Sequence, residues 1–203
     1  MYTPKHFQSD SAEDMKSFIR ENGFGILVSQ VDGKLWGTHI PMILNDEGTS
    51  LLGHVARGNM QWKNFESSGE VLAIFHGPHA YVSSSWYDHE NVPTWNYIAV
   101  HVSGKIKLLD GDALLKSLKL LVNKYEKNSS LPVSVERMSA SFLQKEIRGI
   151  VGFEIPISKM EASYKLSQNR DGENHSRIIK ALEARAEEGS SKVATAMKKR
   201  TPK

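Results

Sequence analysis

Aromatic and polar side chains are concentrated in one stretch of the sequence, from His76 to His101. These twenty-six residues hold two of the four tryptophans, three of the six tyrosines and four of the eight histidines. Aromatic faces stack on flat rings and neighbouring polar groups orient them, so this mixture is typical of a wall for a flat, partly polar ligand. The same composition also suits an aromatic-rich sheet that packs on itself, and composition alone leaves both interpretations open.

A second candidate lies where an expected strand ends at Ala56 and Arg57-Gly58-Asn59 lead into an expected short helix, residues 60–67. A helix N-terminus offers unpaired N–H groups to a phosphate. Arg57 can add two hydrogen bonds, Gly58 lets the backbone approach closely, and Asn59 can cap the helix. The pattern predicts a phosphate seat, although an ordinary strand-to-helix turn with a surface arginine fits the same residues.

Three histidines, His76, His79 and His89, invite a metal interpretation, but Gly77-Pro78 interrupts the His-x-x-His spacing and favours a turn between strands. The chain has no cysteine, which excludes disulfides, thiolate ligands and cysteine nucleophiles. We therefore expect no metal. No Gly-x-Ser-x-Gly elbow, glycine-rich nucleotide fingerprint, Walker motif or basic recognition helix occurs in the sequence.

The hydrophobic pattern predicts a mainly β protein with peripheral helices. Asp32-Gly33 predicts a type I′ hairpin turn, and alternation over 94–109 separates a core face from a face that carries Trp95 and Tyr97. The expected strands are 24–31, 34–44, 49–56, 71–75 (buried on both faces), 81–87, 94–109 and 149–157 with an extension over 159–166. The expected helices are 10–21 (capped by Ser9 or Asp10), 60–67, 112–126, 136–147 and 171–188. Six or seven antiparallel strands predict a closed barrel, because closure removes unpaired edges.

Charge is unevenly distributed along the 203 residues, although the net charge is only +3. Residues 176–203 hold eight Lys and Arg against three Glu, a local charge of +5, while the rest of the chain is close to neutral. We expect one domain over 1–188 and a basic, disordered tail over 189–203. The sequence shows neither an apolar run of membrane-spanning length nor a signal-peptide pattern, so a cytoplasmic location without a membrane partner is expected.

Several segments together resemble the PaiB-type FMN-binding negative transcriptional regulators. The similarity extends to about residue 185 and rests on motifs spread along the chain. These motifs are Met1-Tyr2-Thr3-Pro4 with Phe7, Thr38-His39-Ile40-Pro41, Gly53-His54-Val55-Ala56-Arg57-Gly58-Asn59, Gly77-Pro78 through Tyr81, Ser85-Trp86-Tyr87, Val92-Pro93-Thr94-Trp95-Asn96-Tyr97 and Lys165-Leu166-Ser167-Gln168-Asn169-Arg170.

The resemblance implies a split β-barrel related to pyridoxamine-phosphate oxidase, forming a homodimer with FMN between the subunits. Where the wider superfamily has a Ser-Arg-Lys phosphate segment, this chain has Ala56-Arg57-Gly58-Asn59, so only the arginine carries over. The implied cofactor-binding residues are His39, Ile40, Pro41, Met42, His54, Arg57, Gly58, Asn59, Trp86, Trp95, Asn96, Tyr97, Gln168 and Arg170.

The implied role is repression of degradative protease and sporulation genes, with DNA contacted directly or indirectly. Two alternatives remain open at this point. One is an FMN-dependent oxidoreductase whose effect on transcription is indirect. The other is a haem-binding or haem-degrading split barrel that uses histidines such as His39, His54 or His101.

Overall fold

The computed structural model describes residues 1–9, 11–200 and 202, and all elements given below lie within them. The strands are β1 (Phe24–Val31), β2 (Lys34–Leu44), β3 (Ser50–Ala56), β4 (Glu70–Val82), β5 (Thr94–Lys105), β6 (Lys107–Leu109) and β7 (Ile150–Lys165). The α-helices are α1 (Ala12–Glu21), α2 (Gly111–Glu126), α3 (Ala140–Arg148), α4 (Gly172–Ala184) and α5 (Glu188–Lys198). Short 3₁₀ helices are η1 (Lys5–Phe7), η2 (Met60–Asn64), η3 (Ser84–Trp86) and η4 (Val135–Arg137).

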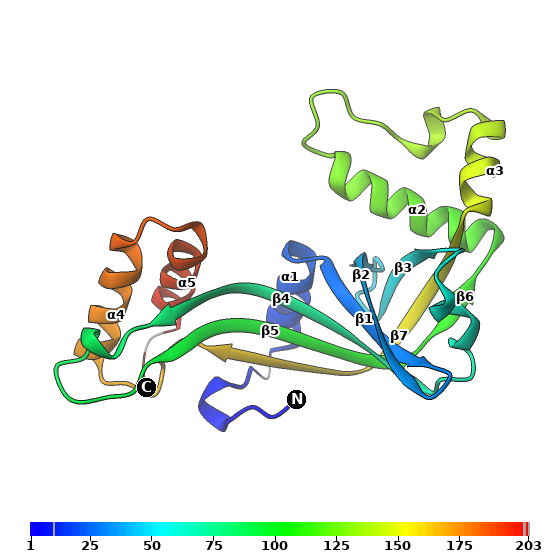
Figure 1. Cartoon of the computed structure of the whole chain (residues 1–203). Helices are drawn as coiled ribbons and strands as arrows, with labels where there is room; N and C mark the ends of the chain where they lie inside the picture. Colours follow the sequence, from blue (N-terminus) through cyan, green and yellow to red (C-terminus); the bar gives the residue numbers. More distant parts are fainter. Residues whose placement is uncertain (10, 201, 203) are drawn as a thin grey trace. The chain divides into compact units, whose positions relative to one another are not determined.

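The seven strands form one sheet in the order β3-β2-β1-β4-β5-β7-β6, and an additional β3–β7 pairing closes that order into a ring. This confirms the prediction of a β-sheet with peripheral helices, although α-helices make up nearly as much of the chain as strands do (Figure 1). The predicted hairpin is also confirmed. Asp32 (φ 51°) and Gly33 (φ 75°) both adopt the left-handed backbone of a type I′ turn, and β1 and β2 pair from Val31↔Lys34 to Phe24↔Pro41.

Contacts divide the chain into two compact units, which are described separately below. The first unit comprises Met1–Met15, His76–Val100 and Glu161–Lys203. The second unit comprises Lys16–Phe75 and His101–Met160. The residues expected to form one domain, 1–188, therefore contribute to both units, and the first unit continues through α5. No helix within the described residues is long and apolar enough to cross a membrane.

The second unit is built around apolar side chains of β1, β2, β3 and β7. Its fully buried members include Leu27, Met42, Leu51, Phe153 and Ile155, and Phe65, which follows η2, packs among them. Phe65 and Phe153 pack edge to face, with ring centroids 5.7 Å apart. Gly53 on β3 leaves the space that this packing needs, because a Cβ there would lie 2.6 Å from Cζ of Phe153.

In the first unit, α4 and α5 lie side by side (Figure 1). Ile178 and Leu182 on α4 and Val193, Ala194 and Met197 on α5 are completely buried. The prediction of a disordered tail from residue 189 is therefore wrong as far as Lys198, because an apolar stripe holds α5 in the core of this unit. Of that tail, residues 201 and 203 lie outside the described residues.

Other expected boundaries shift. The strands predicted at 71–75 and 81–87 are one strand, β4, that runs through Gly77-Pro78 to Val82, after which η3 begins. Along residues 71–75 buried and half-buried positions alternate, so this segment is not buried on both faces as expected. The chain enters α1 with Ser11 Oγ accepting from Asp14 N at 3.1 Å. The expected cap Asp10 lies outside the described residues.

Candidate functional site

The turn after β3 is held by a side-chain network in the second unit. Asn59 caps η2, because its Oδ1 accepts from Gln61 N at 3.0 Å, and this confirms the predicted cap. Asn59 Nδ2 donates to Thr38 Oγ1 at 2.9 Å, and Thr38 Oγ1 donates to Gln61 Oε1 at 2.6 Å. These bonds tie the turn to β2.

Gln61 is a residue that sequence reasoning missed. Its side chain is completely buried, and its Nε2 donates to Leu27 O at 3.1 Å and to Ser29 Oγ at 3.0 Å. A buried amide needs such partners, because an unpaired one costs about 1–3 kcal/mol. The glutamine stands between Met60 and Trp62 with no local pattern that marks it as buried.

Arg57 is exposed and its guanidinium already has protein partners in the second unit. Its Nε donates to Arg148 O at 2.7 Å and its Nη2 donates to Ile150 O at 2.9 Å. The guanidinium carbon also lies 5.8 Å from the ring centroid of Trp62. Two of its three nitrogens are thus committed to backbone carbonyls, which leaves one terminal nitrogen for a phosphate.

The rest of the predicted phosphate seat is weaker than expected. The predicted helix 60–67 is η2, a 3₁₀ segment of five residues, which offers few aligned peptide dipoles. No atom lies within 4 Å of the place where a Cβ of Gly58 would be. The space beside Gly58 is therefore open, and the predicted close approach of its backbone to a phosphate stays a prediction.

Residues predicted to line the ring alternate along β2. Ile40 and Met42 are buried in the core, with 8% and 0% of their surfaces exposed, so their side chains are not available to a ligand. Pro41 is half-buried. His39 is exposed, and its ring lies 6.4 Å from that of Phe24, which is 63% exposed. His54 on β3 is half-buried, and burial lowers its pKa.

The predicted aromatic wall belongs to the first unit, and only part of it is open to solvent. Trp95 is 53% exposed and lies between His79 and Tyr81, with ring centroids 6.0 Å and 5.9 Å away. The ring of Trp86 is half-buried, and the guanidinium of Arg185 lies 4.5 Å from its centroid.

Asn96 and Tyr97 have structural partners in the first unit. Asn96 is completely buried: its Oδ1 accepts from Ser167 Oγ at 3.0 Å, and its Nδ2 donates to Met197 Sδ at 3.4 Å. Tyr97 is half-buried, and its hydroxyl accepts from Ser163 Oγ at 3.3 Å. The side chain of Asn96 therefore stabilises the packing of α5 against β5.

The two late residues of the predicted set lie in the turn between β7 and α4. Gln168 bonds to its own turn, because its Oε1 accepts from Leu166 N at 2.8 Å and its Nε2 donates to Tyr164 O at 2.5 Å. Arg170 is half-buried, and its guanidinium lies 5.1 Å from the ring centroid of Tyr87.

The structure groups the fourteen predicted residues by unit. The second unit contains His39, Ile40, Pro41, Met42, His54, Arg57, Gly58 and Asn59. The first contains Trp86, Trp95, Asn96, Tyr97, Gln168 and Arg170. Among the described residues, no group of three or more His, Asp or Glu side chains is arranged to hold a metal ion. His76 and His79 do lie together, with ring centroids 4.7 Å apart.

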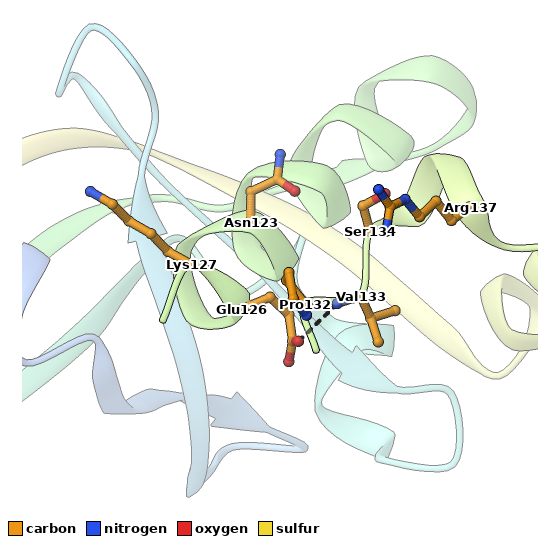
Figure 2. A pocket seen from close by; sticks show the side chains of 7 residues that line it. All are labelled: Asn123, Glu126, Lys127, Pro132, Val133, Ser134 and Arg137. Carbon is orange, nitrogen blue, oxygen red and sulfur yellow. Dashed lines mark hydrogen bonds between the residues drawn. The ribbon is translucent and has the colours of Figure 1, made fainter. Parts of the chain in front are cut away.

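One hollow opens away from the predicted residues, beside the end of α2 and the loop that follows it (Figure 2). Its volume is about 360 Å³. It is lined by Asn123, Glu126, Lys127, Pro132, Val133, Ser134 and Arg137. Glu126 closes the loop, because its Oε2 accepts from Val133 N at 3.0 Å, as the dashed line in Figure 2 shows.

Stability should depend on pH through two histidines that the fold buries. Burial lowers the pKa of His54 and of His175, and in His175 a hydrogen bond with the Leu166 backbone opposes this effect in part. Above the ordinary value of 6.5 both rings are neutral, folded or unfolded. Below pH 6.5 both histidines become protonated in the unfolded chain, whereas in the folded chain they stay neutral down to their lowered pKa values. The free energy of unfolding therefore falls as the pH drops from 6.5 toward those values.

We therefore expect the urea midpoint to be lower at pH 5.5 than at pH 7.5. His175→Phe should lose part of this dependence, because its Nε2 is buried without a hydrogen-bond partner among the described residues. Equal midpoints for the wild-type protein at the two pH values would contradict the argument.

Comparison with known structures identifies the fold. The FAD and heme binding protein from Mycobacterium smegmatis matches with a TM-score of 0.63 at 14% identity, over 78% of this chain and 73% of that one. The flavocytochrome Anf3 from Azotobacter vinelandii matches with a TM-score of 0.61 at 12% identity, over 80% of this chain and 72% of that one. At such identities the likeness concerns the fold alone, which is the split β-barrel expected from the sequence.

Sequence comparison identifies the family. The family model described as "Putative FMN-binding domain" matches residues 1–159, and the chain belongs to this family. The chain is also 42% identical to the Bacillus subtilis protein named "Protease synthase and sporulation protein PAI 2", over 100% of this chain and 99% of that protein. The chain is thus a full-length homologue of PAI 2.

Proposed function

We propose that this chain is an FMN-binding protein that acts as a homodimer and represses genes for degradative proteases and sporulation. The observation that carries the proposal is the 42% identity to PAI 2 along the whole chain, together with membership of the FMN-binding family. FMN, when bound, would supply redox chemistry that no side chain of the protein provides.

Each unit, taken by itself, carries groups that fit one part of a flat cofactor with a phosphate. Trp95, His79 and Tyr81 form an exposed aromatic cluster in the first unit, and exposed ring faces of this kind stack on planar heterocycles. In the second unit, Arg57 retains one terminal nitrogen for an anion, beside the open space at Gly58. Ile40, Met42 and Asn96 are buried and would not contact the cofactor. Their packing would stabilise the strands on which they lie.

Repression is proposed to act without a basic arm at the C-terminus. Three of the positive charges in and beside α5 form ion pairs, since Lys192 binds Glu188 at 2.6 Å, Lys198 binds Glu183 at 2.5 Å and Arg200 binds Asp14 at 2.7 Å. Non-specific DNA affinity depends on clustered Lys and Arg whose charges are available to phosphates. These ion pairs support a mechanism in which the protein affects transcription without binding DNA through its C-terminal cations.

The cofactor proposal is tested by titrating FMN into the purified protein and following quenching of flavin fluorescence. Wild-type protein should quench FMN to a defined stoichiometry and be a dimer by light scattering. Trp95→Ala should weaken FMN binding about tenfold, the loss typical of one aromatic stacking partner. The matched control is Phe142→Ala on α3, which removes an aromatic ring that is 49% exposed and lies outside the predicted set.

Absence of quenching by the wild-type protein, with a colourless absorbance spectrum, would refute FMN binding. A Soret band on addition of haemin would instead support the haem alternative. Turnover of a nicotinamide donor by the FMN-loaded protein would favour the oxidoreductase alternative, in which the effect on transcription is a consequence of catalysis.

A further inference from the structure

Two cationic residues stand at and just after the end of β7 in the first unit. Lys165 is the last residue of β7, and its Nζ donates to Thr94 Oγ1 at 2.5 Å. Arg170 stands five residues later, before α4, with its guanidinium over the ring of Tyr87. The Arg170 charge is close enough to act on Lys165, since burial and that charge together lower the pKa of the lysine.

This pair lacks the carboxylate partner that Arg177, Lys192, Lys198 and Arg200 have in the same unit. Within the described part of the chain, neither Lys165 nor Arg170 forms an ion pair with a carboxylate. Arg170 Nη2 reaches only the neutral Asn91 Oδ1, at 3.5 Å. By contrast, Arg177 on α4 lies 2.8 Å from Glu173. Half-buried like charges without a counter-ion raise the free energy of the folded state, so an anion between them would be favourable.

Asp88 follows Tyr87 and Asp171 follows Arg170 in the sequence, but both carboxylates bind other partners. Asp88 Oδ1 accepts from Asn174 Nδ2 at 2.9 Å and from His89 Nδ1 at 2.6 Å. Asp171 Oδ2 accepts from the same Asn174 nitrogen at 2.8 Å, and Asp171 also caps α4. Hydrogen bonds from Asn174 lower the pKa of both carboxyls, so both are anionic at neutral pH while bound to other partners.

The turn between the two cations is rigidly built. Ser167 adopts the left-handed region (φ 61°), and its carbonyl accepts from Arg170 N at 3.1 Å. Gln168 clamps the same turn through its bonds to Leu166 N and Tyr164 O. Holding a non-glycine residue at positive φ has an energetic cost, which is typical of segments that place functional groups. In addition, the hydroxyl of Tyr87, beneath Arg170, is buried without a hydrogen-bond partner in the described structure.

We propose that Lys165 and Arg170 form a binding site for the phosphoryl group of an anionic ligand, with the Thr94 hydroxyl as a further donor. A lysine supplies a point charge and an arginine a planar fork, and a phosphoryl dianion matches the combined charge of the two. The ligand is either the phosphate of FMN, in which case the site rests on the proposed function, or a separate phosphate-bearing molecule.

The site is tested first with inorganic phosphate, followed by isothermal titration calorimetry on the full-length protein. Wild-type protein should bind phosphate, and Lys165→Met and Arg170→Gln should each lose about tenfold or more in affinity, as expected for a lost charge-assisted hydrogen bond. Lys180→Met and Arg177→Gln are the matched controls, because they remove exposed charges from α4 of the same unit. Both controls should bind phosphate like the wild type.

A second comparison, between FMN and riboflavin, identifies the source of the phosphoryl group. If the group is that of FMN, wild-type protein should prefer FMN to riboflavin, and both site variants should abolish that preference. If the ligand is a separate molecule, the preference should persist in both variants while binding of inorganic phosphate is lost. Arg170→Lys keeps the charge, so it should retain part of the phosphate affinity even if the glutamine variant misfolds.

The site and the proposed function fail in different ways. Phosphate binding that depends on Lys165 and Arg170, without any binding of flavin, would keep the site and refute FMN binding. Flavin binding with phosphate affinity and FMN preference both unchanged in the folded site variants would overturn the site and leave the proposed function standing. A wild-type protein that neither binds inorganic phosphate nor prefers FMN to riboflavin would also overturn the site.

Discussion

Truncation of the chain after Ala186, which removes α5, is expected to abolish cooperative folding of the first unit. Val193 and Met197 are completely buried, and burial of each side chain contributes roughly 1.5–3 kcal/mol. Their loss would also expose Ile178 and Leu182 on α4, and Asn96 would lose its contact with Met197 Sδ. The combined loss of about 5 kcal/mol or more is comparable to the whole stability of a typical domain.

Urea unfolding followed by circular dichroism measures this effect. Met197→Ala should lower stability by about 2–5 kcal/mol, the usual range for a buried methionine. The matched control is Lys192→Ala with Lys198→Ala, which removes two exposed ion pairs from the same helix and should cost no more than about 1 kcal/mol per pair. A truncated protein with the wild-type midpoint and cooperativity would show that α5 is dispensable for the fold.

The error over α5 shows where sequence reasoning failed. Val193, Ala194 and Met197 recur at helical spacing and predict a buried face, but the surrounding Lys, Ser and Gly suggested a solvated tail. Whether residues 189–198 form a buried helix or a solvated tail depends on a surface that they can pack against. That surface is formed by α4 and β5, which lie outside the local sequence pattern of these residues. The hairpin at Asp32-Gly33 was predictable because two adjacent residues determine its turn type.

A similar limit applies to β4 and to the candidate site. Gly77-Pro78 has strong local turn propensity, yet the chain stays extended through it as part of β4, which lies between β1 and β5 in the sheet. Motif resemblance singled out Arg57, Trp95 and Arg170, but it could not show that Arg57 donates to two backbone carbonyls or that Lys165 and Arg170 lack a carboxylate partner. Those properties depend on segments that are far apart in the chain.

A single methyl group added at Gly104 should destabilise the second unit strongly. Gly104 lies on β5 and is buried, and a Cβ there would be 2.1 Å from the carbonyl oxygen of Pro156 and 2.8 Å from Cγ2 of Ile155. The closest atom is backbone, so it cannot move away without displacing β7. We expect Gly104→Ala to cost more than about 3 kcal/mol, above the usual range for overpacking at a flexible side chain.

Two other glycines separate this steric effect from the general effect of replacing glycine in a strand. Gly37→Ala on β2 is the matched control, since the nearest atom to its Cβ is 3.6 Å away, and its stability should be unchanged or slightly higher. Gly152→Ala on β7 should fall between the two, because its Cβ would meet the mobile end of the Leu114 side chain at 2.4 Å. Thermal unfolding should therefore give midpoints in the order Gly104→Ala, Gly152→Ala, Gly37→Ala from lowest to highest, with Gly104→Ala about 10 °C below the wild type. A Gly104→Ala midpoint equal to that of Gly37→Ala would mean that β5 and β7 do not approach each other this closely.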